Sequence, residues 1–476
     1  MKNILISFSA FTLAAAAFFA WYINFRAGVF LTLNGSVELT RLQLISIAAF
    51  ALSASAAMFL TVLCKYLNSA SFKLLPIIFL CSGLCLITAV SVILPVFIET
   101  SYIRGVQGVN YFYKLYDNLP AWETRKELII DSTLYGFYFD LEKAKKAPGG
   151  AAEYAPQIYV EEENIFIERF YVETVPGYYL SANIYVSADP AVNQEPLPLI
   201  MLAHGHFSNG PDYYDRFFDD IQYFGAAFAK RGFLVVAWDM VGRGDDSGTL
   251  PHRNIYNTVL QTYNSMSLLS YLLSERFAAE STYKINEKYV AVTGASGGGT
   301  QTIYMSMFDD RLTASVPVAM VSAYFNGDCP CENGINTLKM GSFKTNGAER
   351  IAAFAPKPLL VISDGADWTK RNPKDEYPFL RYVYSFYGAE QKAESFHDAD
   401  GKHDYGFEKR RKTLDFLLRQ WELPENGVYD IPYTKDGFKL MNAEELKTFS
   451  DTSGLARPDN YVQTCEELYK IITERH

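Results

Sequence analysis

The first hundred residues of the chain contain three long apolar segments without a charged side chain. They span residues 4–25, 42–64 and 74–98. Each is long enough for the ~20 residues that a helix needs to cross ~30 Å of hydrocarbon. Because lipid accepts a spanning segment only when its backbone polar groups are bonded internally, the pattern predicts three transmembrane helices within residues 1–98.

The first apolar segment combines features of a membrane anchor and of a cleaved signal peptide. Lys2 precedes it, and small residues occur near Ala17 and Ala20. Its apolar stretch exceeds the about 7–15 residues usual in a signal peptide, and two further segments follow, so we expect a retained helix, with cleavage as the alternative. The flanking positive charges are nearly balanced. A short N-terminus inside the cell and three crossings would make this an integral membrane protein whose large domain is extracytoplasmic.

Residues 99–160 form a connector that is rich in aromatic side chains near its start. These include Tyr102, Tyr111, Phe112, Tyr113 and Tyr116. Aromatic side chains gather at membrane–water interfaces. Packing onto a following domain explains them equally well, so both interpretations stay open.

From residue 161 to residue 425, short apolar runs alternate with helical patterns. The runs cover residues 198–203, 233–238, 289–293, 314–320 and 358–363, and the helical patterns cover 219–231, 258–275, 300–307 and about 406–421. Strands separated by helices predict an α/β fold with a doubly wound, mostly parallel sheet. Residues 426–476 form a C-terminal extension with one expected helix near residues 464–473.

Charge and cysteine usage add few constraints. The net charge is −10 and no basic stripe is present, which argues against a nucleic-acid-binding protein. Cys329 and Cys331 are too close for a relaxed disulfide. Because no matching Cys or His pair lies beside them in the sequence, we expect a rigid turn rather than a metal-ligand pair. The redox compartment and the oligomeric state stay open.

The strongest chemical signal is the sequence Gly294-Ala295-Ser296-Gly297-Gly298. It follows an apolar strand directly and opens a helical pattern. A Gly-x-Ser-x-Gly turn between strand and helix holds the serine in a strained conformation and exposes its hydroxyl, and the glycines let strand and helix approach each other. We expect Ser296 to be a nucleophile. A glycine-rich phosphate-binding turn is the alternative.

A serine hydroxyl needs a base and an orienting acid. His403 lies on the loop before the last helix of the domain, whereas His397 lies closer to a strand and suits a structural role. Asp364 and Asp367 both follow the apolar run 358–363. Asp367 lies further out on the loop, where it can reach His403, so we prefer it and keep Asp364 as the alternative.

An oxyanion requires two N–H donors. The expected donors are the backbone N–H groups of Gly297, directly after the nucleophile, and of His206, after the run 198–203. His204 and His206 could be taken for a metal pair. No third ligand has a suitable spacing, so we expect neither a metal ion nor a cofactor.

Together these segments resemble the acetyl-xylan-esterase-like branch of the α/β-hydrolase superfamily, which is close to dienelactone-hydrolase-like and prolyl-oligopeptidase-like members. The resemblance covers about residues 160–425 and is carried by His204-Gly205, residues 239–247, residues 293–301, residues 367–370 and residues 403–406. It implies a triad of Ser296, Asp367 and His403. The resemblance does not extend to the three apolar segments. These segments argue against the role of a secreted polysaccharide esterase.

The sequence therefore predicts a membrane-anchored serine hydrolase that needs no cofactor. We expect it to cleave a small-molecule carboxylic ester, as an acetyl esterase does, through an acyl-enzyme. A serine peptidase of prolyl-oligopeptidase-like type is the first alternative, although no propeller of repeated strands precedes the domain. A non-catalytic membrane scaffold on a hydrolase fold is the second alternative, and the intact set of nucleophile, acid and base argues against it.

Overall fold

The computed structural model describes residues 106–193, 196–206, 215–327, 329–334, 339–340, 343–423 and 439–474. The chain divides into two compact units, Met1–Ile103 and Arg104–His476, and all described residues belong to the second. The predicted transmembrane helices at residues 4–25, 42–64 and 74–98 lie outside the described residues. Within the described part of the chain, no helix is both long and apolar enough to cross a membrane.

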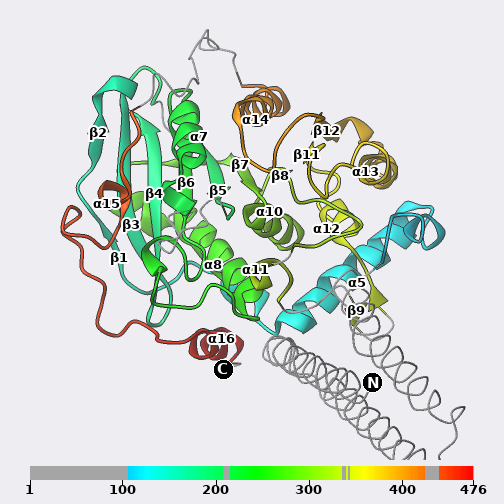
Figure 1. The fold of residues 1–476 in the computed structure, drawn as a ribbon, viewed down its shortest axis with the longest axis horizontal. Helices are drawn as coiled ribbons and strands as arrows, with labels where there is room; N and C mark the ends of the chain where they lie inside the picture. Colours follow the sequence, from blue (N-terminus) through cyan, green and yellow to red (C-terminus); the bar gives the residue numbers. More distant parts are fainter. Residues whose placement is uncertain are drawn as a thin grey trace, which may run out of the picture. The chain divides into compact units, whose positions relative to one another are not determined.

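A mixed β-sheet runs through the centre of this unit (Figure 1). Its strands are β1 (Ala152–Tyr154), β2 (Ile158–Val160), β3 (Ile165–Val175), β4 (Tyr178–Ser187), β5 (Leu197–Ala203), β6 (Leu234–Trp238), β7 (Ile285–Ala295), β8 (Ala314–Val318), β11 (Leu359–Asp364) and β12 (Ala393–Asp398). Their order is β1-β3-β4-β6-β5-β7-β8-β11-β12, with β2 paired to β3. Strands β9 (Lys339–Met340) and β10 (Phe343–Lys344) pair separately.

The sheet is antiparallel at one side and parallel over the rest. Strands β1 to β4 form an antiparallel meander, and β4 is antiparallel to β6. From β6 to β12 every neighbouring pair is parallel. Parallel strands need crossover connections, and helices supply most of them here.

The helices cover both faces of the sheet. The α-helices are α5 (Leu119–Phe137), α6 (Leu141–Ala144), α7 (Asp219–Ala229), α8 (Asn257–Leu272), α9 (Glu275–Glu280), α10 (Gly297–Phe308), α11 (Pro330–Asn333), α12 (Gly347–Ala352), α13 (Glu376–Ser385), α14 (Phe407–Gln420), α15 (Ala443–Leu446) and α16 (Cys465–Thr473). Short 3-10 turns are η3 (Phe112–Lys114), η4 (Glu161–Glu163), η5 (Asp215–Phe217), η6 (Gly244–Asp246) and η7 (Glu390–Lys392). Helices α7 and α14 lie on one face, and α8, α10, α12 and α13 lie on the other (Figure 1).

Two hydrophobic cores lie on the two faces, and alternate residues of each central strand feed them. In β5, Leu199 and Met201 join the core beneath α8 and α10, whereas Ile200 and Leu202 join the core beneath α7 and α14. This alternation follows from the two-residue period of a strand. It explains why the central strands are continuously apolar, since both of their faces are covered.

The predicted alternation of strands and helices is confirmed. The five predicted apolar runs correspond to β5, β6, β7, β8 and β11, and the predicted helices correspond to α7, α8, α10, α14 and α16. The antiparallel meander was not predicted, and its first two strands lie inside the segment that we assigned as a connector. Extended, partly exposed segments of three residues such as β1 carry too little periodicity to reveal a strand.

The aromatic part of the connector packs onto the sheet-bearing unit. Phe112 is fully buried, with its ring 5.7 Å from that of Phe379. The hydroxyl of Tyr116 donates a hydrogen bond to the carboxylate of Glu349 at 3.1 Å. Among the two explanations left open by the sequence, packing therefore applies to these side chains, while Tyr111 stays exposed.

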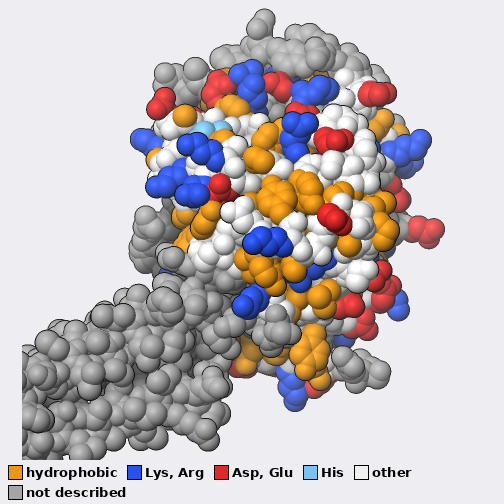
Figure 2. Space-filling view, turned by 90° about the vertical axis from the view of Figure 1, so that its right-hand side faces the viewer, with side chains coloured by type: hydrophobic (Ala, Val, Ile, Leu, Met, Phe, Trp, Pro, Cys, Tyr) orange, Lys and Arg blue, Asp and Glu red, His pale blue; other side chains and the backbone are white. Residues whose placement is uncertain are grey.

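One face of the unit shows exposed hydrophobic side chains with Lys, Arg, Asp and Glu side chains around and between them (Figure 2). Several of the large hydrophobic side chains that remain exposed belong to residues 111–138: Tyr111, Leu115, Leu128, Tyr135 and Tyr138. The C-terminal extension, in contrast, buries Cys465, Leu468 and Ile472 of α16 in the main core. The chain beyond residue 439 is thus part of the folded unit.

Candidate active site

Ser296 occupies the tight turn between β7 and α10. Its backbone angles, φ 58° and ψ −122°, lie in a region that non-glycine residues rarely adopt. The turn is held because the Ser296 N–H donates to the carbonyl of Val318 at 3.1 Å. Strained backbone of this kind persists where surrounding structure over-determines it, as it does at many active sites.

The glycines beside Ser296 are required by the close approach of β5. A Cβ atom at Gly294 would lie 2.4 Å from the carbonyl oxygen of Ala203, and one at Gly298 would lie 2.1 Å from the same oxygen. Real side chains cannot occupy such positions without moving the strand. The two glycines of the Gly-x-Ser-x-Gly pattern thus allow the close approach of strand, turn and helix that the sequence led us to expect.

The segments that carry the predicted site residues leave the sheet at the same edge. The residues in register there are Ala203 with Gly294, Ala295 with Val318, Val318 with Ile362, and Ile362 with Phe396. Ser296, Asp367 and His403 follow these strand ends at short intervals. The loop of His403 is also tied to the strand of Ser296, since the hydroxyl of Tyr405 lies 2.6 Å from Oγ1 of Thr293.

The structure brings Asp367 and His403 into contact. Nδ1 of His403 lies 2.7 Å from Oδ2 of Asp367. The other oxygen, Oδ1, accepts hydrogen bonds from the backbone N–H and the hydroxyl of Thr369, each at 2.6 Å. A carboxylate held on both oxygens orients the imidazole and keeps its proton on Nδ1, which leaves Nε2 as the basic atom.

Asp364 is occupied by a different partner. Its side chain is fully buried and lies 2.6 Å from Nζ of Lys409, itself buried on α14. Burial raises the pKa of Asp364 to about 6, an effect that the ammonium group of Lys409 opposes. The backbone N–H of Asp364 donates to the hydroxyl of Thr369, and this hydrogen bond stabilises the loop that carries Asp367.

The remaining histidines named by the sequence occupy structural positions. Nδ1 of His397, on β12, lies 2.9 Å from the hydroxyl of Ser363. His204 is fully buried, with Nδ1 2.9 Å from the carbonyl of Gly205 and Nε2 accepting from the N–H of Met240 at 3.1 Å. Burial lowers the pKa of His204 to about 4, so this imidazole is neutral at physiological pH.

Gly297 and His206, the residues expected to supply the oxyanion donors, lie next to each other. Gly297 is the first residue of α10, where a backbone N–H has no acceptor within the helix. A Cβ atom at Gly297 would meet Cε1 of His206 at 2.8 Å, so the His206 ring lies against the residue after the nucleophile. The loop after β5 therefore reaches the turn that holds Ser296.

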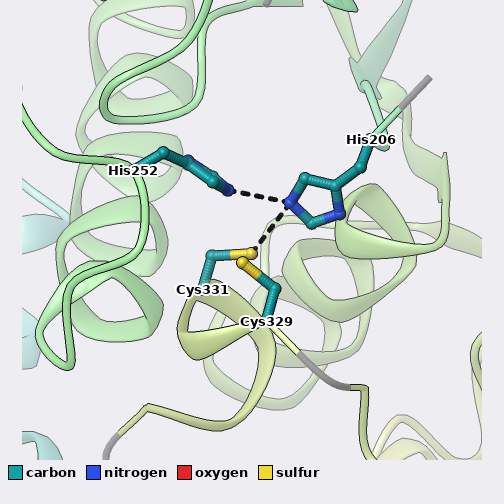
Figure 3. Close-up of side chains that lie close together, drawn as sticks. All are labelled: His206, His252, Cys329 and Cys331. Atoms are coloured by element: carbon teal, nitrogen blue, oxygen red, sulfur yellow. Dashed lines mark hydrogen bonds between the residues drawn. The ribbon is translucent and has the colours of Figure 1, made fainter. Parts of the chain in front are cut away.

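The side chain of His206 belongs to a cluster that sequence reasoning missed. His206, His252, Cys329 and Cys331 converge on one point (Figure 3), and one ligand atom from each lies within 4.8 Å of all the others. Nε2 of His206 lies 2.8 Å from Nε2 of His252 and 3.1 Å from Sγ of Cys331. The structure thus places a pair of histidines beside Cys329 and Cys331, which inspection of the sequence did not reveal.

The cluster escaped detection because its members come from three loops far apart in the sequence. His206 and His252 are 46 residues apart, and Cys331 follows His206 by 125 residues. The loops follow β5, β6 and β8, which are parallel strands that end at the same edge of the sheet. The Cys-x-Cys pair was the signal in the sequence that could have indicated this cluster. Its histidine neighbours are His206 and His252, and not the His204 and His206 pair that the sequence suggested.

A buried ion-pair network supports the loop between β6 and His252. Nε and Nη2 of Arg216 donate to the two carboxylate oxygens of Asp239 at 2.6 and 3.1 Å, and Arg216 also contacts Asp245. Burial raises the pKa of Asp239 to about 7, an effect that Arg216 opposes. Gly242, with φ 75°, lets the same loop pass close to His252, because a Cβ atom at Gly242 would lie 2.5 Å from the backbone nitrogen of His252.

Comparison with known proteins supports the fold. No family model matches the sequence, and no curated protein matches it. Among solved structures, the chain is similar to methylesterase BT1017, with 27% sequence identity, a TM-score of 0.65 and 76% of each chain covered.

Two further solved structures are more distant. A Bacteroides fragilis protein assigned as an acetyl xylan esterase is 15% identical with a TM-score of 0.44, covering 64% of this chain and 81% of that one. A glucuronoyl esterase of carbohydrate esterase family 15 from Caldicellulosiruptor kristjansonii is 20% identical with a TM-score of 0.43, covering 70% and 93%. The chain has the α/β-hydrolase fold.

Proposed function

We propose that this chain is a serine hydrolase of carboxylic esters, with Ser296 as nucleophile, His403 as general base and Asp367 as orienting acid. The observation that carries the proposal is the strained turn at Ser296, at the sheet edge where the hydrogen-bonded pair of Asp367 and His403 also emerges. Ser296 is 7% exposed, which suits a nucleophile at the base of a shielded site.

The mechanism follows from the roles of these groups. The Ser296 oxygen attacks the ester carbonyl while Nε2 of His403 takes its proton, and Asp367 stabilises the resulting imidazolium. The N–H groups of Gly297 and His206 donate to the oxyanion, and such preorganised donors each contribute about 3–4 kcal/mol in related chemistry. His403 then protonates the leaving alcohol, and water releases the acid from Ser296 by the reverse sequence.

The substrate class divides into two kinds of ester. The family resemblance of the sequence favours acetyl esters, in which a small acyl group is transferred to Ser296. Similarity to a protein named methylesterase adds methyl esters, in which the large acid is transferred and methanol leaves. Trapping the acyl-enzyme and measuring its mass distinguishes the two, since an acetyl group and a large acyl group differ greatly in mass.

The test uses the full-length chain in a mild detergent, labelled with a fluorophosphonate and then assayed on acetyl esters, methyl esters and peptide amides. We expect labelling on Ser296 and faster turnover of an ester than of any amide. Ser296→Ala should abolish both signals, because no other group replaces the nucleophile. Ser385→Ala, which changes an exposed serine of α13, is the matched control and should leave both unchanged.

Three results would contradict the proposal. Fluorophosphonate labelling of another serine in the Ser296→Ala variant would move the nucleophile. Preferential cleavage of peptide amides would make the protein a peptidase. Absence of both labelling and turnover in a folded chain would favour a non-catalytic scaffold.

A further inference from the structure

We propose that His206, His252, Cys329 and Cys331 bind one zinc ion, which fastens the loop after β5 to α11 and to the loop before α8. The four side chains point toward one another from three separate segments (Figure 3). His252, Cys329 and Cys331 are each less than a tenth exposed. The cluster therefore offers two nitrogen and two sulfur donors to one ion at a buried position.

The donor types match the ligand preference of zinc, and their separations bracket those of a zinc site. Tetrahedral zinc with bonds of about 2.0–2.1 Å to nitrogen and about 2.3 Å to sulfur places its ligand atoms about 3.3–3.8 Å apart. The separations here run from 2.8 Å between the two Nε2 atoms up to a limit of 4.8 Å across the cluster. Two thiolates with two imidazoles in a tetrahedral arrangement favour zinc among the common divalent ions.

The hydrogen bonds around the imidazoles prepare both Nε2 atoms to bind a cation. Nδ1 of His252 lies 2.7 Å from the carbonyl oxygen of Val241, so the proton resides on Nδ1 and Nε2 presents a lone pair. The carboxylate of Glu332 faces Nδ1 of His206 at 3.9 Å and favours the same tautomer there. Two lone pairs aimed at each other across 2.8 Å repel, whereas an ion between them binds both.

Outer groups complete the arrangement that metal-bound histidines usually show. A carbonyl or carboxylate behind each imidazole orients the ring and raises its basicity. Glu332 serves twice, since it also accepts a hydrogen bond from the backbone N–H of Cys329 at 3.2 Å. Helix α11 is fixed from its other side, where the Thr258 hydroxyl of α8 donates to the carbonyl of Pro330 at 2.8 Å.

Four protein ligands close the coordination shell, so the ion would leave no position for water or substrate. Its effect is therefore positional rather than that of a Lewis acid. The ring of His206 lies against Gly297. The backbone N–H of His206 is the second proposed oxyanion donor, so an ion that fixes the His206 ring would also fix this donor. This consequence rests on the proposed function, whereas the metal site itself does not.

Metal analysis of the full-length chain, purified in detergent without chelators, tests the site directly. We expect one zinc per chain in the wild type and in Cys465→Ser, which changes a buried free cysteine of α16 outside the cluster. The double substitution Cys329→Ser with Cys331→Ser should lose the metal. No bound metal in the wild type, another metal in place of zinc, or zinc retained by the double variant would overturn the proposal.

Cobalt(II) substitution keeps the test decisive if the double variant does not fold. Cobalt added to metal-depleted, reduced wild-type chain should produce thiolate-to-cobalt charge-transfer absorption and the intense visible bands of tetrahedral cobalt. Zinc should displace these bands at one equivalent. Cobalt binding without sulfur bands, or no binding, would show a proton-shared network of thiols and imidazoles instead of a metal site.

Failure of the metal site and failure of the proposed function give different results. Zinc bound to a chain that fluorophosphonate does not label at Ser296 would leave the metal site intact and reject the hydrolase. Labelling of Ser296 in a chain that binds no zinc would support the hydrolase and reject the metal site. If both hold, removal of zinc should lower kcat more than it raises KM, because the oxyanion donor acts mainly in the transition state.

Discussion

Nδ1 of His403 lies 2.7 Å from the carboxylate of Asp367, whereas Asp364, three residues earlier, is paired with Lys409. Asp367→Asn should therefore lower kcat by orders of magnitude, about 10⁴-fold if it behaves as the equivalent change does in serine proteases, because an amide holds the wrong imidazole tautomer. Asp364→Asn should have a much smaller effect on kcat. Steady-state rates on the best ester of the panel provide the measurement.

The Asp364→Asn substitution removes one of the two carboxylates that pair with Lys409, so it could also affect folding. Asp404 remains 2.8 Å away, so the ammonium group keeps a partner. Circular dichroism should confirm that both variants fold before their rates are compared. If Asp364→Asn proved the more damaging of the two folded variants, the acid of the triad would be Asp364.

The buried pair of Arg216 and Asp239 predicts a large loss of stability on substitution. Arg216→Met should destabilise the folded state by about 3–5 kcal/mol, because it leaves Asp239 and Asp245 buried without their shared cation. Urea unfolding of the full-length chain in detergent, followed by tryptophan fluorescence, measures the change. Arg411→Met removes a cation of a surface pair with Glu408 and should cost at most about 1 kcal/mol. Equal effects of the two substitutions would contradict this account.

Acid should destabilise the chain through His204. The unfolded imidazole has a pKa of about 6.5, whereas burial lowers the folded value to about 4. Between these values the unfolded state binds a proton that the folded state does not, so stability falls as pH decreases through that window. Relative to a non-titrating variant, wild type should lose about 2 kcal/mol between pH 8 and pH 5.

His204→Gln supplies the non-titrating reference, because its amide oxygen can accept from the Met240 N–H as Nε2 does. Urea unfolding of both proteins at pH 8 and pH 5 gives the difference in stability at each pH. Other titrating groups, including Asp239 with its oppositely directed shift, are common to both proteins and cancel. If the free energy of unfolding of wild type relative to His204→Gln did not fall between pH 8 and pH 5, the folded protein would bind a proton at His204 as readily as the unfolded chain.

The apolar segments at residues 4–25, 42–64 and 74–98 predict an integral membrane protein. The full-length chain should sediment with membranes and resist extraction by alkaline carbonate. With the N-terminus inside and three crossings, protease added to intact cells should reach the unit that contains Ser296.

Protection of that unit until the cells are permeabilised would contradict the proposed orientation. Release of the chain by carbonate would contradict the membrane assignment itself. Cleavage of the first segment as a signal peptide would appear as a mature N-terminus near Trp21, and mass analysis of the purified chain detects it.

Local patterns in the sequence were sufficient for the parallel part of the fold. Buried strands such as β5 and β6 are continuously apolar because helices cover both faces of the sheet, and this property is written in consecutive residues. The strand-to-helix turn at Ser296 could also be recognised from consecutive residues, although the crowding that requires Gly294 and Gly298 comes largely from Ala203 on β5, far away in the sequence. In the meander, β1 and β2 were missed because they are short and partly exposed. Strands β3 and β4 are long and buried, but buried polar residues such as Glu168, Arg169 and Asn183 interrupt their apolar pattern.

Pairings between loops were decided by the tertiary structure. Asp364 and Asp367 look alike in sequence, and only the positions of Lys409 and His403 assign them different partners. The same holds for the cluster of His206, His252, Cys329 and Cys331, whose members meet because β5, β6 and β8 end at one edge of the sheet. Sequence determines which side chains stand at strand ends, but strand order and register decide which of them come within bonding distance.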